Sequence, residues 1–438
     1  MMSISGTRRF VIACILFANI TISGFYEAMG FCYESNVPSR GKILFVGGHG
    51  NNNYTSIQEA IENASCGDTI FVYSGTYHEN VVVNKPIKLI GENKLLTIVD
   101  AGQRGDGIRI EANNVVIYNF TIRNTGIGNS VEYIENAAVK IVQSDNTLVE
   151  DVICYDTNYG IWADFSNHST IKNCTIYGFY DGIALHRCRG FTLRNNTLVN
   201  SSITIGGLSL TELIHDIDIS NTVNGKPVYY YVNRSGITVP ENAGEVILVN
   251  CSNFTISHLN ISGGTVGIDL MFSNNNTISN NIIRGMTDFG ISLHESDGNI
   301  IENNSISCCP FGIGFRNASA IFKEGFKTRA NCEHNIVRYN SINRCSYVGL
   351  ILIGSNNNII SHNDFIRNNI DARFIMSYGN KWERNYWDEW IGLKYPILDF
   401  LPKIIWGSQI KWLWWSNIWM NFDWYPALKP YHTWCNSG

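Results

Sequence analysis

The sequence is poor in charged residues, and this bears on which kinds of binding partner are expected. Charged residues make up 16% of the 438 residues, and the net charge at pH 7 is −5. A chain without a basic surface cannot neutralise phosphates, so we do not expect nucleic acid as a partner. Polar amides and hydroxyls supply the solubility instead.

The sequence also lacks the usual patterns of metal and redox sites. The twelve cysteines are scattered, without a CxxC pair or a metal-finger spacing, and no tract is rich in Met or His. We therefore predict no cofactor from composition, with copper or calcium as the alternatives to test. Cys309 and Cys345 each follow an equivalent strand residue by three positions, so we expect them on neighbouring coils, either as core thiols or as a disulfide.

Only the ends of the chain contain long apolar runs. Arg8 and Arg9 precede an apolar run from Phe10 to Ile22, which small residues follow. This pattern indicates an export signal at residues 1–31, because the run is short for a membrane-spanning helix. An uncleaved anchor is the alternative. We therefore expect an exported protein that is extracellular, periplasmic or on the cell surface.

One repeat dominates the chain and predicts its fold. Gly267–Leu270 and Gly290–Leu293 begin two copies of a unit that continues to Ile278 and Ile301, and both pairs are offset by 23 residues. A short period with strand composition and Gly/Asn punctuation is typical of a β-solenoid. We predict an all-β fold, a single-stranded parallel β-helix of 22–23-residue coils over residues 41–384. About a dozen such coils are expected.

The central strand residue of each coil marks where this period holds and where it breaks. It recurs at Ile117, Leu148, Ile171, Leu193, Ile256, Ile278, Ile301, Val337, Ile360 and Trp382. Insertions are expected before Lys140 and around Ala318–Ala330. Residues 221–245 are expected to leave the solenoid as an excursion with hairpin character. Its Tyr229, Tyr230 and Tyr231 either stack on sugars or pack against the wall.

Asparagine follows many of the strands, for a structural reason. It tolerates left-handed turn conformations, and its amide can bond to the same amide one coil away, which predicts ladders. The same richness creates fifteen Asn-x-Ser/Thr sequons, among them Asn167, Asn195 and Asn275, which are glycosylation acceptors in exported proteins.

Both ends of the solenoid are expected to be covered. An amphipathic helix at 56–64, with Ser56 and Glu59 as a capping box, is expected to cover the first coil. Residues 385–438 are expected to form an aromatic cap, because ten of the eleven tryptophans lie between Trp382 and Trp434. Contact with a membrane surface through Trp412, Trp414, Trp415 and Trp419 is the alternative role of this cap.

Two resemblances add to this interpretation. The succession of helix, GDTIFVYSGTYHENVVV and KPIKLIGE resembles the N-terminal end of right-handed parallel β-helix proteins of the pectin-lyase-like superfamily. With its NxxI-type coils, VNGKPVYYY, ILVNCSNFTISHLNIS, NYWD and FDWYP, the chain resembles the NosD-like family over residues 41–431. Members are known as periplasmic copper-binding β-helix proteins, and their repeats are grouped with carbohydrate-binding proteins and sugar hydrolases. The resemblance implies a right-handed β-helix and export.

Strand alternation predicts which side chains face outward. Because Ile268 and Leu270 point inward, the second and fourth residues after each coil's glycine point outward. These outward pairs are Trp162/Asp164, Ala184/His186, Ser209/Thr211, Asp269/Met271, Ser292/His294 and Gly314/Arg316. We expect Trp162, Asp164 and His186, together with the three tyrosines, to bind ligand.

The candidate catalytic residues are Asp269, His294, Glu295 and Arg316. Asp269 with Glu295 would supply the carboxylate pair of a glycoside hydrolase, whereas His294 with Arg316 would supply the base and the charge-neutralising group of a lyase. Met271 and His294 are the candidate copper ligands. His186 is expected about four coils from His294, roughly 19 Å at the ~4.8 Å strand spacing, too far to join them.

The sequence favours an exported β-helix protein that binds an extended ligand, with a polysaccharide or glycoconjugate as the expected partner. The first alternative is a polysaccharide lyase or glycoside hydrolase, although no recognised catalytic signature is present. The second alternative is a copper-handling accessory protein of the NosD type.

Overall fold

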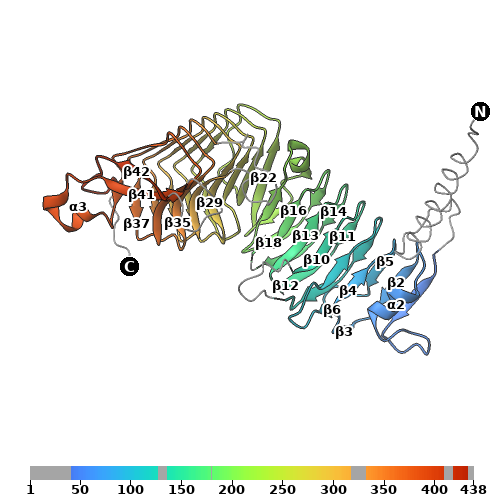
Figure 1. Cartoon of the computed structure of the whole chain (residues 1–438). Coiled ribbons are helices and arrows are strands. Elements are labelled where there is room, and N and C mark those ends of the chain that lie inside the picture. The colour runs from blue at the N-terminus through green and yellow to red at the C-terminus, as the bar shows by residue number, and fades with distance from the viewer. Residues whose placement is uncertain (1–40, 127–135, 179, 317–331, 409–417, 433–438) are drawn as a thin grey trace, which may run out of the picture.

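The chain is a parallel β-helix of about 15 turns, somewhat more than the dozen expected. The computed structural model describes residues 41–126, 136–178, 180–316, 332–408 and 418–432. The expected signal peptide, the insertion at Ala318–Ala330 and the tryptophans at 412, 414 and 415 lie outside the described residues. The turns form two stacks that meet at β22 (Lys226–Val232) (Figure 1).

Three parallel sheets surround the core of the first stack. The first contains β1 (Ile43–Val46), β2 (Thr69–Val72), β5 (Lys88–Gly91), β8 (Val116–Tyr118), β11 (Leu148–Glu150), β14 (Thr170–Lys172), β17 (Thr192–Arg194) and β20 (Asp216–Ile217). The second contains β4 (Val81–Val83), β7 (Ile108–Ile110), β10 (Ala137–Val142), β13 (Tyr159–Asp164), β16 (Ile183–His186) and β19 (Ile203–Gly206). The third contains β3 (Gly75–Tyr77), β6 (Thr97–Asp100), β9 (Thr121–Arg123), β12 (Ile153–Thr157), β15 (Thr175–Gly178), β18 (Thr197–Val199) and β21 (Thr222–Val223).

The second stack repeats this arrangement. Its first sheet begins at β22 and continues with β23 (Glu245–Val249), β26 (Ile268–Met271), β29 (Phe289–His294), β32 (Phe311–Arg316), β35 (Val348–Ile353), β38 (Ile370–Ile375) and β41 (Lys403–Ser408). The second contains β24 (Thr255–Ser257), β27 (Thr277–Ser279), β30 (Ile300–Glu302), β33 (Ile336–Arg338), β36 (Ile359–Ser361), β39 (Lys381–Glu383) and β42 (Ile418–Asp423). The third contains β25 (Asn260–Ser262), β28 (Ile282–Arg284), β31 (Ser305–Ser307), β34 (Ser341–Asn343), β37 (Asp364–Ile366) and β40 (Tyr386–Trp387).

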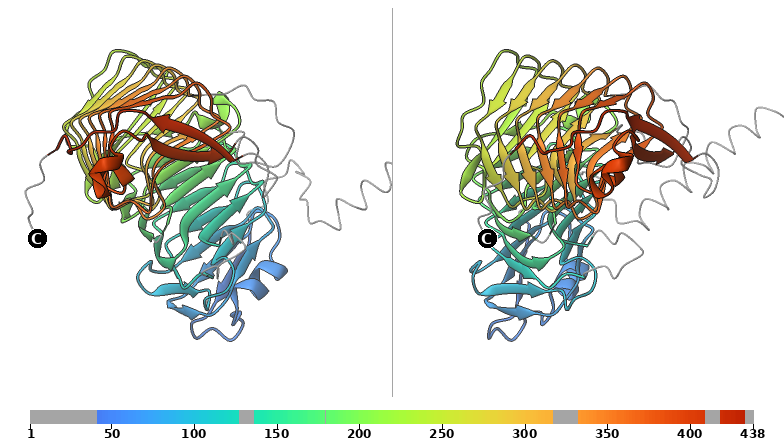
Figure 2. Two further views of the ribbon diagram at one scale, coloured as in Figure 1. Left: turned by 60° about the vertical axis from the view of Figure 1, so that its left-hand side comes forward. Right: turned by 90° about the vertical axis from the view of Figure 1, so that its left-hand side faces the viewer.

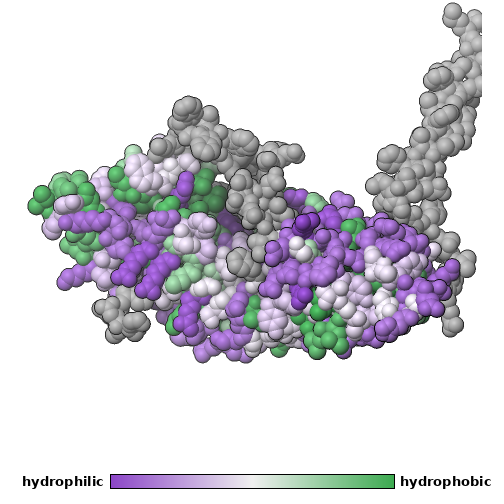
Figure 3. Space-filling model, turned by 90° about the horizontal axis from the view of Figure 1, so that it is seen from below, coloured by the Kyte–Doolittle hydropathy of each residue, from purple (hydrophilic) through white to green (hydrophobic). Residues whose placement is uncertain are grey.

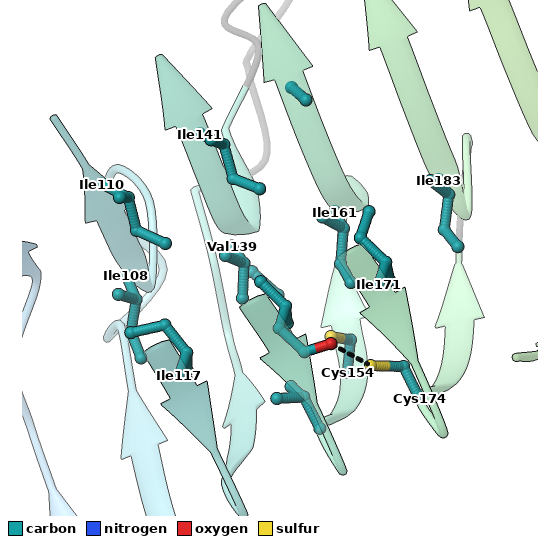
Figure 4. Packing of buried hydrophobic residues seen from close by; sticks show 14 of the residues in the cluster. Ile108, Ile110, Ile117, Val139, Ile141, Cys154, Ile161, Ile171, Cys174 and Ile183 are labelled. Carbon is teal, nitrogen blue, oxygen red and sulfur yellow. Dashed lines mark hydrogen bonds between the residues drawn. The ribbon is translucent and has the colours of Figure 1, made fainter. Parts of the chain in front are cut away.

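Aliphatic side chains at equivalent positions of successive turns form columns that fill the core, as Figure 4 shows for the first stack. Ile278 lies opposite Ile301 in the strand register, and both side chains are fully buried. The expectation for Leu148 is wrong by one residue, because Val149 is the fully buried neighbour of Ile171. A shift of one residue in a strand moves a side chain to the other face of the sheet.

Cysteines occupy the same kind of core position. Cys154 and Cys174 are buried free thiols in the first core (Figure 4). Cys309 and Cys345 follow the paired residues Ile306 and Ile342, but they too are free thiols, so the alternative of a disulfide is wrong.

Two buried asparagine ladders run through the turns of the second stack, as the sequence predicts. In each ladder the side-chain Nδ2 donates to the Oδ1 of the asparagine one turn later, at 2.9–3.1 Å. The first ladder is Asn276, Asn299, Asn335, Asn358 and Asn380, and the second is Asn281, Asn304, Asn340, Asn363 and Asn385. The second ladder ends at the buried carboxylate of Asp423, which accepts from the Asn385 amide at 3.0 Å.

The helix α2 (Ile57–Asn63) lies against the first turns. Ser56 is its N-cap and accepts from the Glu59 backbone amide at 3.2 Å. The carboxylate of Glu79 accepts from the next two backbone amides, those of Ile57 and Gln58, at 2.9 Å, which differs from the expected capping box, where Glu59 would accept from the Ser56 amide. A carboxylate from a later coil therefore satisfies the free amides of the helix N-terminus.

The chain reverses at Asn224 and Gly225, where the solenoid changes direction. Both residues have positive φ angles, 50° and 77°, which a two-residue type I′ hairpin requires. β21 pairs antiparallel with β22, and β22 then pairs in parallel with β23. The expected excursion at 221–245 is therefore wrong for β22, because this strand is the first rung of the second stack.

The wall of the second stack closes the end of the first stack. Along β23, Val246 and Leu248 belong to the core of the second stack, whereas Ile247 and Val249 belong to the core of the first. Met271 likewise packs into the first core. The two stacks therefore share one strand layer, and their axes run in different directions (Figure 1, Figure 2).

At the C-terminal end, some aromatic residues are buried and others are exposed. Trp387, Trp390 and Ile405 belong to the second core, whereas Trp406 and Trp424 are exposed. The end also includes the helices α3 (Ile391–Lys394) and η3 (Pro396–Leu398); a third short helix, η1 (Leu210–Leu213), lies in the first stack. Within the described ranges, no helix has the length and apolar character to cross a membrane.

Candidate functional site

The outer face of β10, β13 and β16 holds an aromatic and polar group of side chains. The strand register places Lys140 beside Trp162, and Asp164 beside His186. The Trp162 ring lies 4.7 Å from the Tyr159 ring and 4.2 Å from the His186 ring, and the Lys140 Nζ lies 6.0 Å from the indole centroid. We call these five residues the outer-face cluster.

The accessible groups of this cluster are its polar ones. Trp162 is only 3% exposed, so its neighbours cover the indole ring. Lys140, Asp164 and His186 are partly exposed. Burial raises the pKa of the Asp164 carboxyl, and Arg187 and Lys140 oppose that rise. Burial, with the nearby Arg187, lowers the pKa of His186 to about 4, so this imidazole is neutral at pH 7. The cluster presents a cation, a carboxyl and a neutral imidazole side by side.

The second stack brings together three of its predicted site residues. The His294 Nε2 lies 3.6 Å from the Asp269 carboxylate and 3.2 Å from the Arg316 guanidinium, and Ser292 Oγ lies 3.0 Å from the same nitrogen. Burial and Arg316 lower the pKa of His294 well below its ordinary value. A neutral imidazole can accept the guanidinium hydrogen bond, so His294 and Asp269 do not form an ion pair at pH 7.

Tyr180 lies between the outer-face cluster and the second stack. The Thr265 hydroxyl of the second stack donates to the Tyr180 carbonyl at 2.9 Å, and the Thr265 amide donates to the Ser202 hydroxyl at 3.0 Å. Burial and then Asp288 raise the pKa of the Tyr180 phenol, whereas Arg316 lowers it. Since the Tyr180 ring also lies 5.6 Å from the Tyr159 ring, it connects the outer-face cluster to the second stack.

Four carboxyl groups lie where the stacks join, those of Asp181, Glu245 and Asp269 buried and that of Asp288 half-buried. Burial raises the pKa of Asp181 to about 7 and that of Asp269 to about 6, and it raises the pKa of Glu245 and Asp288 as well. Glu245 accepts from the Ile203 amide of the first stack at 3.1 Å, so it links the two stacks directly. We call the six residues Asp181, Glu245, Asp269, Asp288, His294 and Arg316 the joint cluster.

The structure brings one of the two expected catalytic pairs into contact, because the Arg316 guanidinium lies 3.2 Å from the His294 Nε2. Asp269 is buried, and burial raises its pKa, which Arg316 and Ser292 oppose. The carboxylate that adds to this rise is Asp288 and not Glu295. Glu295 follows the end of β29 and has a positive φ angle of 48°. The expected glycosidase pair of Asp269 and Glu295 therefore has one buried member, and the polar groups around Asp269 are arranged as a fixed joint.

The candidate copper ligands are adjacent, but they do not fit a copper ion. Met271 pairs with His294 in the strand register, yet its thioether is buried in the first core. The Arg316 guanidinium lies 3.2 Å from the imidazole nitrogen that would bind the metal, and its charge repels a cation. Within the described parts of the chain, no group of three or more His, Cys, Asp and Glu residues could hold a metal ion.

The three consecutive tyrosines pack into the structure. The Tyr230 hydroxyl donates to the Leu213 carbonyl at 2.5 Å, and its ring packs on the first core. Tyr229 and Tyr231 stack on each other 6.2 Å apart and pack on the second core. Of the two roles that the sequence left open, these contacts favour packing against the wall.

Sequence reasoning missed Lys140, Tyr159, Tyr180, Asp181, Glu245 and Asp288. Tyr159 and Asp181 immediately precede the glycine of their coils, and Asp288 stands two residues before Gly290. The residues before each coil glycine, in addition to those after it, therefore indicate which side chains reach the outer face. Lys140 was detectable from its outward position between the buried Val139 and Ile141.

Comparison with known proteins places the chain in a family. Residues 61–226 and 211–392 match the family described as periplasmic copper-binding protein (NosD). A cell surface glycoprotein of Methanothermus fervidus is 35% identical over 264 residues, which are 59% of this chain and 43% of that protein. The chain thus spans less than half the length of this curated relative.

Several solved structures are similar at low identity. The A-module of the Azotobacter vinelandii mannuronan C-5 epimerase AlgE6 is 17% identical, with a TM-score of 0.36 and coverage of 74% of this chain and 94% of that chain. A PL6 alginate lyase in complex with a trisaccharide is 12% identical, with a TM-score of 0.36 and coverage of 81% and 88%. Likeness at this level does not identify an activity.

Proposed function

Because the chain belongs to the NosD family of periplasmic copper-binding proteins, we propose that it is an exported β-helix protein, and that it binds carbohydrate at the outer-face cluster. The observation on which this rests is the row of partly exposed Lys140, Asp164 and His186 above buried Trp162 and Tyr159. Parallel strands hold such groups at the ~4.8 Å spacing of the sheet, which suits an extended chain of hydroxyl-bearing units. The copper role of the family name is not proposed, since the candidate ligands do not fit the ion.

Several observations support export. The family is described as periplasmic, and the relative from Methanothermus fervidus is a cell surface glycoprotein. Cys66 is disulfide-bonded, and disulfides persist mainly in oxidising compartments outside the cytosol. Asn195 and Asn275, two of the sequon asparagines, are exposed.

Exposed apolar side chains at the C-terminal end support a second proposal, attachment to a membrane surface. Ile397, Phe400 and Tyr425 are 83%, 71% and 75% exposed, and Trp424 is also exposed. Figure 3 shows hydrophobic residues gathered at this end of the molecule. Large apolar patches with aromatic residues are typical of membrane interfaces, where one part of the side chain is apolar and another is wet. We therefore propose that this end contacts the lipid–water interface.

A glycan array followed by analysis of the soluble products tests the binding proposal. We expect the wild-type protein to retain a polysaccharide that the double variant Lys140→Ala/His186→Ala does not retain. Lys172→Ala is the matched control, because Lys172 lies on another sheet of the same stack, where it pairs with Glu150 at 3.0 Å. Equal binding by wild type and double variant would refute this site, and shortened glycan among the products would show an enzyme instead of a binding protein.

A further inference from the structure

A pocket of about 520 Å³ opens where the last strands of the second stack separate. β38 and β41 pair only through Phe374 with Gly407 and Ile375 with Ser408, among the residues that the structure describes. On its other edge the whole of β41 pairs antiparallel with β42. Ile370–Arg373 and Lys403–Trp406 therefore line two sides of the pocket. Its volume lies within the range of about 300–1,000 Å³ that is typical of small-molecule sites.

A buried charged group lies in the wall of this pocket. Asp371 is 8% exposed, and it accepts from the Lys403 Nζ at 3.2 Å and from the Asn368 Nδ2 at 3.4 Å. The Lys403 Nζ also lies 5.3 Å from the centroid of the buried Trp387 ring. These contacts fix the carboxylate and the ammonium in place before a ligand arrives, which lowers the entropic cost of binding.

The lining is balanced in charge and mixed in polarity. It contains two carboxylates, Asp371 and Glu389, and two cations, Arg373 and Lys403, so neither a cation nor an anion is favoured. Trp406, whose side chain is about half exposed, also lines the pocket. A sugar ring matches such a lining, because its hydroxyls both donate and accept while its C–H face is apolar.

We propose that this pocket binds uncharged sugar units of a glycan, with the Trp406 indole against the sugar ring and the Asp371–Lys403 pair at its hydroxyls. The site is separate from the outer-face cluster, which lies in the first stack. A test of this site can fail while the proposed function holds, and the reverse, since none of the lining residues belongs to the outer-face cluster.

Isothermal titration of the full chain with four neutral tetrasaccharides, namely cellotetraose, maltotetraose, laminaritetraose and mannotetraose, tests the proposal. Trp406→Ala is the test variant, because its side chain is exposed and its loss leaves the core intact. Trp419→Ala is the matched control: Trp419 is 49% exposed and lies opposite Gly407 in the same hairpin, but it does not line the pocket. Lys140→Ala/His186→Ala separates this site from the outer-face cluster.

We expect at least one tetrasaccharide to bind wild type and Trp419→Ala alike and to bind Trp406→Ala about tenfold more weakly. The same tenfold difference should appear when Trp406→Ala is made in the Lys140→Ala/His186→Ala variant. Asp371→Asn should weaken binding of the same sugar, because it removes the charge that Lys403 holds in place. No binding of any of the four sugars at millimolar concentration would overturn the proposal. Binding that Trp406→Ala retains in full, or an effect of Trp406→Ala that disappears in the Lys140→Ala/His186→Ala variant, would overturn it as well.

Discussion

Replacing Asn304 with leucine tests how much the buried amides stabilise the second stack. The Asn304 side chain makes four hydrogen bonds within its ladder. Its Nδ2 donates to the Ile278 carbonyl and to the Asn340 Oδ1, both at 2.9 Å. Its Oδ1 accepts from the backbone amide and the side-chain amide of Asn281, at 3.0 and 2.9 Å. Leucine has nearly the same size but satisfies none of these partners.

The expected loss follows from those four bonds. An intramolecular hydrogen bond contributes about 1 kcal/mol net, and a buried group left without a partner costs at least as much. Asn304 is 1% exposed, so water cannot replace the lost partners. We therefore expect Asn304→Leu to lower the free energy of unfolding by about 4 kcal/mol.

Urea unfolding, followed by tryptophan fluorescence, measures this loss. Ten of the eleven tryptophans lie between Trp382 and Trp434, so fluorescence reports mainly on the second stack. The exposed Asn260 provides the control, since Asn260→Ala should change the free energy by no more than about 0.5 kcal/mol. A loss below about 1 kcal/mol in Asn304→Leu would show that the backbone ladders alone hold the turns together.

Two further predictions concern the joint and the C-terminal end. Because the folded-state pKa of Asp181 is about 7, above its ordinary 3.8, the folded state holds this proton more tightly, and the free energy of unfolding should fall as pH rises from 4 to 7. Asp181→Asn should remove on the order of 4 kcal/mol of that fall in urea titrations, and an unchanged pH slope would contradict the prediction. Wild type should co-sediment with phosphatidylglycerol vesicles, whereas Ile397→Ser/Phe400→Ser should bind severalfold less. Leu95→Ser, a change of an exposed side chain in the first stack, should bind like wild type, and a loss equal to that of the double variant would refute specific contact.

The repeating parts of the fold were predictable, because they depend on local period. The 23-residue offset between Ile278 and Ile301 requires parallel stacking, and the regular asparagines require ladders. The sequence predicted the chain reversal at Asn224 and Gly225 as a hairpin, but it did not predict that a second stack begins there. Whether β22 leaves the solenoid or begins a new stack depends on its pairing with Glu245–Val249, which no local pattern encodes.

The site was predictable only in part for the same reason. The alternation along β13 and β16 correctly placed Trp162, Asp164 and His186 on one face. The spacing of roughly 19 Å between His186 and His294 assumed one straight stack at ~4.8 Å per turn, and the change of direction at β22 makes that assumption wrong. Asp269 was expected on an open face, but the wall of the second stack packs on the first and buries it.

The second asparagine ladder ends at a carboxylate, that of Asp423. Every asparagine of the ladder after Asn281 accepts from the asparagine one turn earlier and donates to the next residue of the ladder, so such a ladder could in principle continue through a fibre of stacked chains. Asp423 accepts from the backbone and side-chain amides of Asn385 and from the Trp387 indole, at 2.9–3.1 Å. An ionised carboxylate has no hydrogen to pass on. The ladder therefore ends at a residue that cannot donate to a further asparagine. This end opposes end-to-end polymerisation of a molecule that is built from self-complementary layers.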